Sequence, residues 1–207
     1  MANSFFIKDK ITYHFRRNST LYCFMIISFI VGVVVGLYFI FTDFKYTSLL
    51  TSSDKIIFDY ITGTASYVDV FYSRFTNIVI CLLIIFVFNI SSYTSFLGYI
   101  FVGYQTSLFV MSCGAIISLY GLSGVLNVVL FVVPVNLINI IIMMISNVLC
   151  SRRALSQKEF KLKFFQSFKE DDFLLFYFTC VLCALGVCLI NSFVLPLLIK
   201  SFVVINY

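Results

Sequence analysis

Uncharged apolar segments, each long enough to cross a lipid bilayer, recur along this chain. The first is residues 21–41, LYCFMIISFIVGVVVGLYFIF, and similar segments lie near 75–90, 95–119, 122–149 and 173–199. A transmembrane helix needs about 20 predominantly apolar residues. Only 11% of the residues are charged, whereas about a quarter are charged in water-soluble domains. The sequence therefore predicts an all-α polytopic membrane bundle of about five transmembrane helices, folded as a single membrane domain over residues 1–207.

Two short links between these segments predict tight helical hairpins. Residues 91–94, SSYT, are all that separates the second segment from the third. Residues 119–124, LYGLSG, turn the third segment into the fourth and contain two glycines, which permit sharp reversals of the chain. We therefore expect the second, third and fourth segments to form a nearly continuous three-pass unit.

Lysine and arginine collect in two tracts, which predict the orientation of the chain. Residues 1–20 contain four basic residues and residues 151–172 contain six, whereas residues 42–74 contain three against four aspartates. Cytoplasmic loops carry an excess of Lys and Arg, and five crossings put the two basic tracts on the same side. We therefore expect a cytoplasmic N-terminal tail (1–20), an extracytoplasmic loop (42–74), a basic cytoplasmic loop (151–172) and a C-terminus outside.

The predicted spans lack the groups that catalysis requires. They contain no Asp, Glu, Lys, Arg or His, and His14 in the N-terminal tail is the only histidine. The seven cysteines lie within or at the end of apolar segments and are expected to be buried as small hydrophobic residues. Without a base, a Ser–His dyad, a zinc site or a proton relay is disfavoured. We expect no enzyme activity, no metal and no cofactor. Nucleic acid is not an expected partner either, because topology and anionic lipids explain the basic tracts better.

Small residues follow one face of the first segment. Ser28, Gly32 and Gly36 are spaced four apart, which places a shallow groove where another helix backbone can approach closely. The alternative is that glycine is simply frequent in membrane helices. We predict that these three residues form a helix-packing face, either for a partner protein or for self-association into a homo-oligomer.

The fourth segment, GVLNVVLFVVPVNLINIIIM at 124–143, contains a helix breaker and several amides. Pro134 cannot donate a backbone hydrogen bond, so the helix should bend and free a carbonyl acceptor. Asn136, Asn139 and Asn147 lie within about 80° of one another around the helix axis. Such a polar stripe should face protein rather than lipid. We therefore expect a packing centre or a narrow cavity at Pro134 and Asn136.

Residues 120–140, YGLSGVLNVVLFVVPVNLINI, resemble the signature of the stage II sporulation protein M family. That signature is a Tyr-Gly turn, a further glycine, an aliphatic run and the tetrad Pro-Gln-Asn-Leu, in which Val135 replaces the glutamine here. GVVVGLYF in the first segment and FVGYQTSLFV at 101–110 are also similar to parts of that family, whereas ISSYT replaces its Gly-Xaa-Pro turn. The residues that carry the motif and the expected packing centre are Gly121, Gly124, Pro134, Asn136, Leu137 and Asn139.

The resemblance implies a non-enzymatic, multi-pass protein of the bacterial cytoplasmic membrane. It implies a scaffold that anchors and localises peptidoglycan-remodelling partners during sporulation engulfment or a related envelope process. The partners that it implies are a lytic transglycosylase and an amidase/endopeptidase, beside the membrane lipids.

The residues leave two other functions open. In the first, the chain is a membrane-embedded subunit of an exporter or channel, and the polar stripe lines the path of the substrate. In the second, it is a membrane chaperone or insertase, which needs a hydrophilic groove open to one leaflet.

Overall fold

A computed structural model describes residues 15–42, 66–156 and 173–203 of the chain. Within these ranges the regular elements are helices, without strands: α2 (Ser19–Thr42), α4 (Tyr67–Phe88), α5 (Ser95–Asn127), the π-helical turn η2 (Val128–Val132), α6 (Val133–Ser156) and α7 (Phe173–Val203). Four helices are long and apolar enough to cross a membrane, and α7 adds the shorter apolar segment Tyr177–Ile190. The prediction of an all-α polytopic membrane bundle is therefore confirmed.

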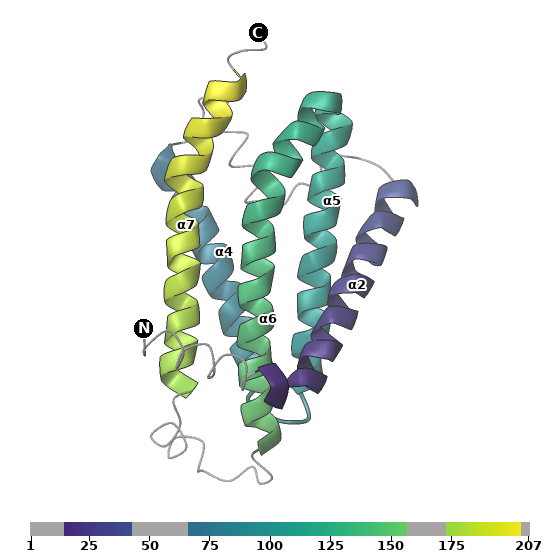
Figure 1. The fold of residues 1–207 in the computed structure, drawn as a ribbon, viewed down its shortest axis with the longest axis vertical. Helices are drawn as coiled ribbons and strands as arrows, with labels where there is room; N and C mark the ends of the chain where they lie inside the picture. Colours follow the sequence, from purple (N-terminus) through teal and green to yellow (C-terminus); the bar gives the residue numbers. More distant parts are fainter. Residues whose placement is uncertain (1–14, 43–65, 157–172, 204–207) are drawn as a thin grey trace.

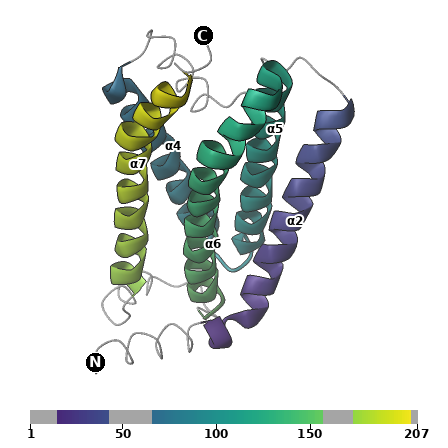
Figure 2. The same cartoon turned by 45° about the horizontal axis from the view of Figure 1, so that its top comes forward.

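The helices run side by side, with their ends gathered at the two ends of the bundle (Figures 1 and 2). α2 begins, α6 ends and α7 begins at the lower end in Figure 1. The end of α2, the start of α4 and the end of α7 lie at the upper end. The helix ends that flank the two basic tracts thus lie together. Most of the expected loops 1–20, 42–74 and 151–172 falls outside the described residues, and the side of the membrane that each end faces stays a prediction.

One apolar core joins buried residues of α2, α4, α5, α6 and α7. α2 makes its most extensive contact with α5, whereas α4, α6 and α7 pack on one another. Met25, Ile85, Val102 and Val148 are among the fully buried side chains of the apolar core. Because lipid is as apolar as these side chains, close packing and polar contacts rather than exclusion of water hold the helices together.

α4 begins earlier than the sequence analysis predicted. Ser66 caps the helix: its Oγ accepts a hydrogen bond from the backbone N–H of Asp69 at 3.3 Å, and the Asp69 carboxylate accepts one from the Ser66 N–H at 2.9 Å. This reciprocal pair is a capping box, which satisfies two backbone donors at a helix start. Helix α4 therefore includes Arg74, which the sequence analysis counted in the expected loop 42–74.

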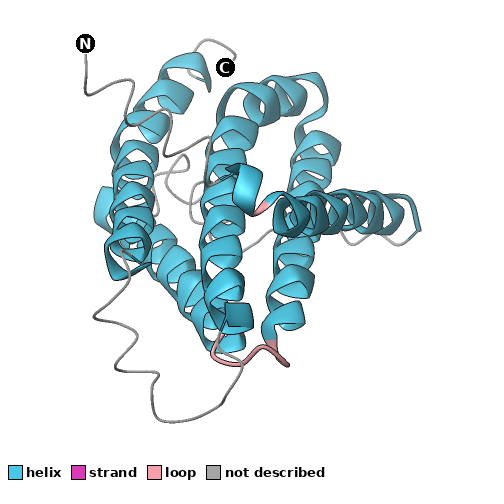
Figure 3. Ribbon diagram, turned by 60° about the horizontal axis from the view of Figure 1, so that its bottom comes forward, coloured by secondary structure: helices cyan, strands magenta, loops and turns pink. Residues whose placement is uncertain are grey.

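Both predicted hairpins are present. A short loop through Asn89 and Thr94 joins α4 to α5 and appears pink at the lower edge of Figure 3. The second reversal occurs inside the element α5, at Gly121, whose φ of 57° and ψ of −128° interrupt the helical backbone. After this reversal Gly124 lies against the preceding helix, because a Cβ on Gly124 would be 2.6 Å from the carbonyl oxygen of Ile116.

The fourth segment bends where the sequence predicted. The π-helical turn η2 directly precedes α6, and Pro134 is the second residue of α6. Proline is tolerated in the first turn of a helix, where its missing N–H has no partner to lose. A π-helical turn widens the hydrogen-bonding pattern by one residue and re-aims the helix. Figure 1 shows the chain bending between the top of α5 and the straight part of α6.

Candidate functional site

A small cavity of about 70 Å³ lies among α4, α5 and α6. Each of the three helices contributes polar side chains to its wall. The polar residues that line it are Arg74 and Asn77 from α4, Gln105 from α5, and Asn136 and Asn139 from α6. Apolar residues of the same helices complete the wall. The cavity is therefore a polar site within an otherwise apolar bundle.

Helical spacing aligns these side chains. Arg74 and Asn77 are three residues apart on α4, and Asn136 and Asn139 are three apart on α6, a spacing that puts two side chains on the same helix face. Gln105 faces them from α5. Asn136 and Asn139, which the sequence analysis expected to face protein, both line this cavity.

Arg74 lies within a candidate membrane span and is only 6% exposed. The span is Phe71–Phe88, so Arg74 is three residues, or about 4.5 Å along the helix axis, inside its end. Charged residues within transmembrane segments are rare and costly, and such residues mark functional positions. Sequence reasoning missed Arg74 because it began the second span at residue 75. The signal that could have found it is the pattern Ser66-Tyr67-Val68-Asp69 of the capping box.

Asn139 leaves one polar atom without a partner. Its side-chain Oδ1 is buried and makes no hydrogen bond within the structure. A buried polar group without a partner costs about 1–3 kcal/mol. Since Asn139 lines the cavity, a molecule inside the cavity is the natural partner for this amide.

Asn147 belongs to a different polar cluster, at the lower end of the bundle. The Asn89 Nδ2 donates a hydrogen bond to the Asn147 Oδ1 at 2.7 Å. The Asn89 Oδ1 accepts hydrogen bonds from the hydroxyls of Ser95 and Ser151, each at 2.7 Å. All four residues are buried, and Gly98 leaves room for them, since a Cβ on Gly98 would be 2.1 Å from the Asn147 Oδ1.

This cluster ties the α4–α5 turn to α6 and has a structural role. The predicted stripe of three asparagines therefore divides into two sites, one at the cavity and one at the turn. The sequence analysis did not identify Asn89, Ser95 or Ser151. Their only signal was an asparagine at the end of an apolar segment followed by hydroxyl residues.

The predicted packing centre at Pro134 and Asn136 needs correction. Pro134 is exposed on the outside of the bundle, and Leu137 is 39% exposed. Only Asn136 and Asn139 of the motif residues in α6 reach the cavity. Pro134 shapes the helix, because it follows the π-helical turn, but it does not form the centre of the packing.

The small residues of the first span pack against α5 of the same chain. A Cβ on Gly32 would be 2.3 Å from the carbonyl oxygen of Gly103, and one on Gly36 would be 2.8 Å from the Val110 Cβ. Ser28 donates a hydrogen bond from its Oγ to the carbonyl oxygen of Tyr99. This face is therefore a helix-packing face, as predicted. Because α5 of the same chain lies against Gly32 and Gly36, the further expectation that this face binds a partner or a second copy stays a prediction.

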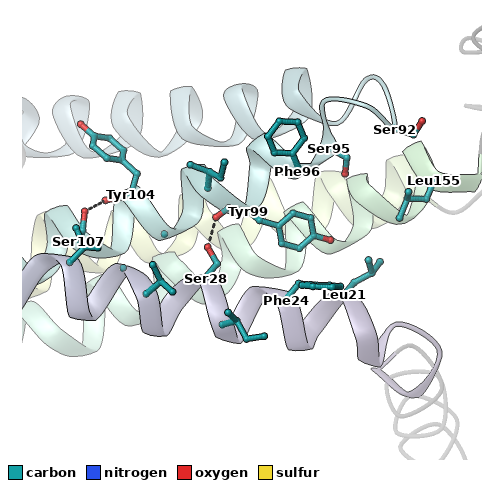
Figure 4. Close-up of a pocket in the computed structure, with 16 residues that line it drawn as sticks. Leu21, Phe24, Ser28, Ser92, Ser95, Phe96, Tyr99, Tyr104, Ser107 and Leu155 are labelled. Carbon is teal, nitrogen blue, oxygen red and sulfur yellow. Dashed lines mark hydrogen bonds between the residues drawn. The ribbon is translucent and has the colours of Figure 1, made fainter.

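A larger apolar groove of about 730 Å³ runs along the same pair of helices (Figure 4). Phe24 and Ile27 of α2 and Phe96 and Ile100 of α5 line it, and each of these side chains is more than half exposed. Figure 4 shows a few hydroxyls along the groove, with Ser28 directed at the Tyr99 carbonyl. The groove is a surface feature that apolar material from the membrane can enter.

Among the described residues, no group of three or more His, Cys, Asp or Glu side chains gathers in a way that could hold a metal ion. No protein-family model, curated protein or solved structure matches the chain. The resemblance to the stage II sporulation protein M family therefore rests on the residues quoted for it above.

Proposed function

We propose that this multi-pass membrane protein is a non-enzymatic scaffold that anchors and localises partner proteins. The observation that supports this most directly is the way in which α2 is held. α2 packs mainly on α5, and only 17% of its candidate membrane span is buried. The rest of the helix, together with the groove beside it, is available to a transmembrane helix of another protein. Helices associate in lipid through this kind of close apolar packing.

The resemblance described above supports a more specific form of this proposal. In that form the host membrane is the bacterial cytoplasmic membrane, and the partners are a lytic transglycosylase and an amidase/endopeptidase. The scaffold would hold these wall hydrolases in place during sporulation engulfment or a related envelope process. The contact surface that we propose is the α2–α5 groove, whose lining includes Ser28 and Gly32 of the predicted packing face.

Co-purification from native membranes tests this proposal. Ile27 lines the groove and is 56% exposed, whereas Ile30 is 53% exposed and lies outside the groove. Substitution of Ile27 by Trp fills part of the groove, so we expect Ile27→Trp to reduce the recovery of wall hydrolases. Ile30→Trp adds the same bulk to the same helix and serves as the matched control. Equal recovery with the two variants would contradict the proposed surface.

The orientation can be tested independently. We propose that the N-terminus is cytoplasmic and that the C-terminus is outside, because the helix ends beside both basic tracts lie at one end of the bundle and α7 ends at the other (Figure 1). Reporter fusions at the two chain ends should then report opposite compartments. Reporters in the same compartment would rule out this orientation.

The polar cavity favours a second candidate function. A subunit of an exporter or channel needs polar groups inside the membrane, and Arg74, Asn136 and Asn139 provide them. Purified protein in liposomes should then support a flux of small solutes that Asn136→Leu reduces. Liposomes that stay tight with the wild-type protein would remove this candidate.

A further inference from the structure

We propose that the cavity at Arg74 binds a single small anion of the size of chloride or nitrate. This inference does not depend on the scaffold function, because the cavity lies among α4, α5 and α6, away from the α2–α5 groove.

Charge is the first argument. Arg74 carries a positively charged guanidinium group inside the bundle, and the residue is only 6% exposed. The apolar residues around it, such as Ile140 and Met143, lower the local dielectric constant and strengthen the attraction of an opposite charge. The cavity therefore favours an anion over a cation or an apolar molecule.

The hydrogen-bond donors are the second argument. The guanidinium has five N–H donors and each side-chain amide has two, so Arg74 and Asn77 can keep their contacts within the bundle and still donate to a ligand. Four amides from three helices surround the same small volume: Asn77, Gln105, Asn136 and Asn139. The Asn139 Oδ1 makes no hydrogen bond, so this amide can rotate about its last bond and turn its NH₂ group toward a bound anion at little cost. The wall can thus replace much of the hydration that an anion loses.

Size is the third argument. The cavity measures about 70 Å³, whereas drug-sized ligands need cavities of roughly 300 Å³ or more. It therefore suits a small anion and is too small for a nucleotide.

Equilibrium binding of radioactive chloride to the full-length protein tests the proposal. The protein is placed in nanodiscs of phosphatidylcholine, which carry no net charge, and chloride replaces gluconate at constant ionic strength. We expect saturable binding of one chloride per chain, with nitrate as a competitor. Absence of saturable binding would show that the cavity holds only water and would overturn the proposal.

Three variants locate the site. Arg74→Gln should weaken chloride binding at least tenfold, because it removes the positive charge. Arg152→Gln is the matched control, since Arg152 is a half-buried arginine near the end of α6 and does not line the cavity. It should bind chloride as the wild type does.

Asn139→Leu leaves Arg74 in place and replaces one amide of the cavity wall by an apolar side chain of similar volume. It should weaken chloride binding severalfold, and it tests the site independently if Arg74→Gln does not fold. Unchanged affinity in Asn139→Leu and in a folded Arg74→Gln would overturn the assignment of the site.

Discussion

The contact between α2 and α5 depends on the absence of a side chain at Gly32. An ideal Cβ at this position would lie 2.3 Å from the Gly103 carbonyl oxygen and 2.8 Å from the Thr106 Cβ. A carbon and a carbonyl oxygen approach to about 3.3 Å at closest. Because the nearest obstacle is backbone, a change of rotamer cannot relieve the clash. In the variant Gly32→Ala the two helices must therefore separate by about 1 Å, which is the difference between these distances.

The expected magnitude follows from a comparison with a second helical glycine. Nothing lies within 4 Å of a Cβ placed on Gly186 in α7. Both Gly32→Ala and Gly186→Ala gain roughly 1 kcal/mol from the better helix propensity of alanine. Only Gly32→Ala suffers overpacking, which costs about 1–3 kcal/mol. We therefore expect Gly32→Ala to be less stable than Gly186→Ala by about 2 kcal/mol, or about 30-fold in the unfolding equilibrium constant.

Titration with sodium dodecyl sulfate in mixed micelles measures this difference in the free energy of unfolding. The chain contains 13 tyrosines and no tryptophan, so near-ultraviolet circular dichroism reports on the tyrosines. Tyr99 lies at the α2–α5 contact, with its ring centroid 6.2 Å from that of Phe24. Equal stability of Gly32→Ala and Gly186→Ala would refute the argument that the close backbone approach at Gly32 determines this contact.

Three further predictions concern the polar cluster, the second hairpin and the start of α4. Asn89→Ala and Asn147→Ala should each lower the free energy of unfolding by about 1–3 kcal/mol, because each substitution leaves the other asparagine buried without this hydrogen-bond partner. The double variant should show a coupling energy of roughly 1 kcal/mol, and strictly additive effects would contradict the hydrogen bond between them. Gly121→Ala should lower the free energy of unfolding by about 1–3 kcal/mol. The cause is backbone strain alone, because the φ of Gly121 is 57° and nothing lies within 4 Å of an added Cβ. Unchanged stability in the same titration would show that this backbone conformation is not required. The hydrogen bonds from the Ser66 side chain and backbone lower the pKa of Asp69 below 3.8. The capping box therefore stabilises the folded state above that value and is lost as the pH falls through the lowered pKa. Nuclear magnetic resonance of the Ser66 and Asp69 backbone amides should give a titration midpoint for Asp69 below 3.8. In Ser66→Ala this midpoint should rise toward 3.8. A wild-type midpoint at or above 3.8 would contradict the capping box.

The sequence predicted those features of the fold that depend on neighbouring residues. The α4–α5 link and the reversal at Gly121 were identified because a short link or a glycine acts locally. The bend before Pro134 was identified for the same reason. The start of α4 was missed, because hydropathy alone places a span boundary at the charged Arg74, whereas the capping box at Ser66 begins the helix at Tyr67.

The partners of the polar and small residues could not be predicted in this way. The spacing of Ser28, Gly32 and Gly36 indicated that some backbone could approach closely, but not that the backbone of α5 would do so. A run of asparagines on one helix likewise indicated a buried face. It did not show that Asn147 would bind Asn89, 58 positions away, or that Asn139 would share a cavity with Arg74.

Local sequence is enough to specify that the chain forms apolar helices joined by short turns, because a backbone in lipid must satisfy its own hydrogen bonds and a helix does so within one segment. The tertiary structure was needed to see which helices lie together and therefore which polar groups meet. Contacts between distant segments depend on how side chains fit across helices, and local spacing does not contain that information.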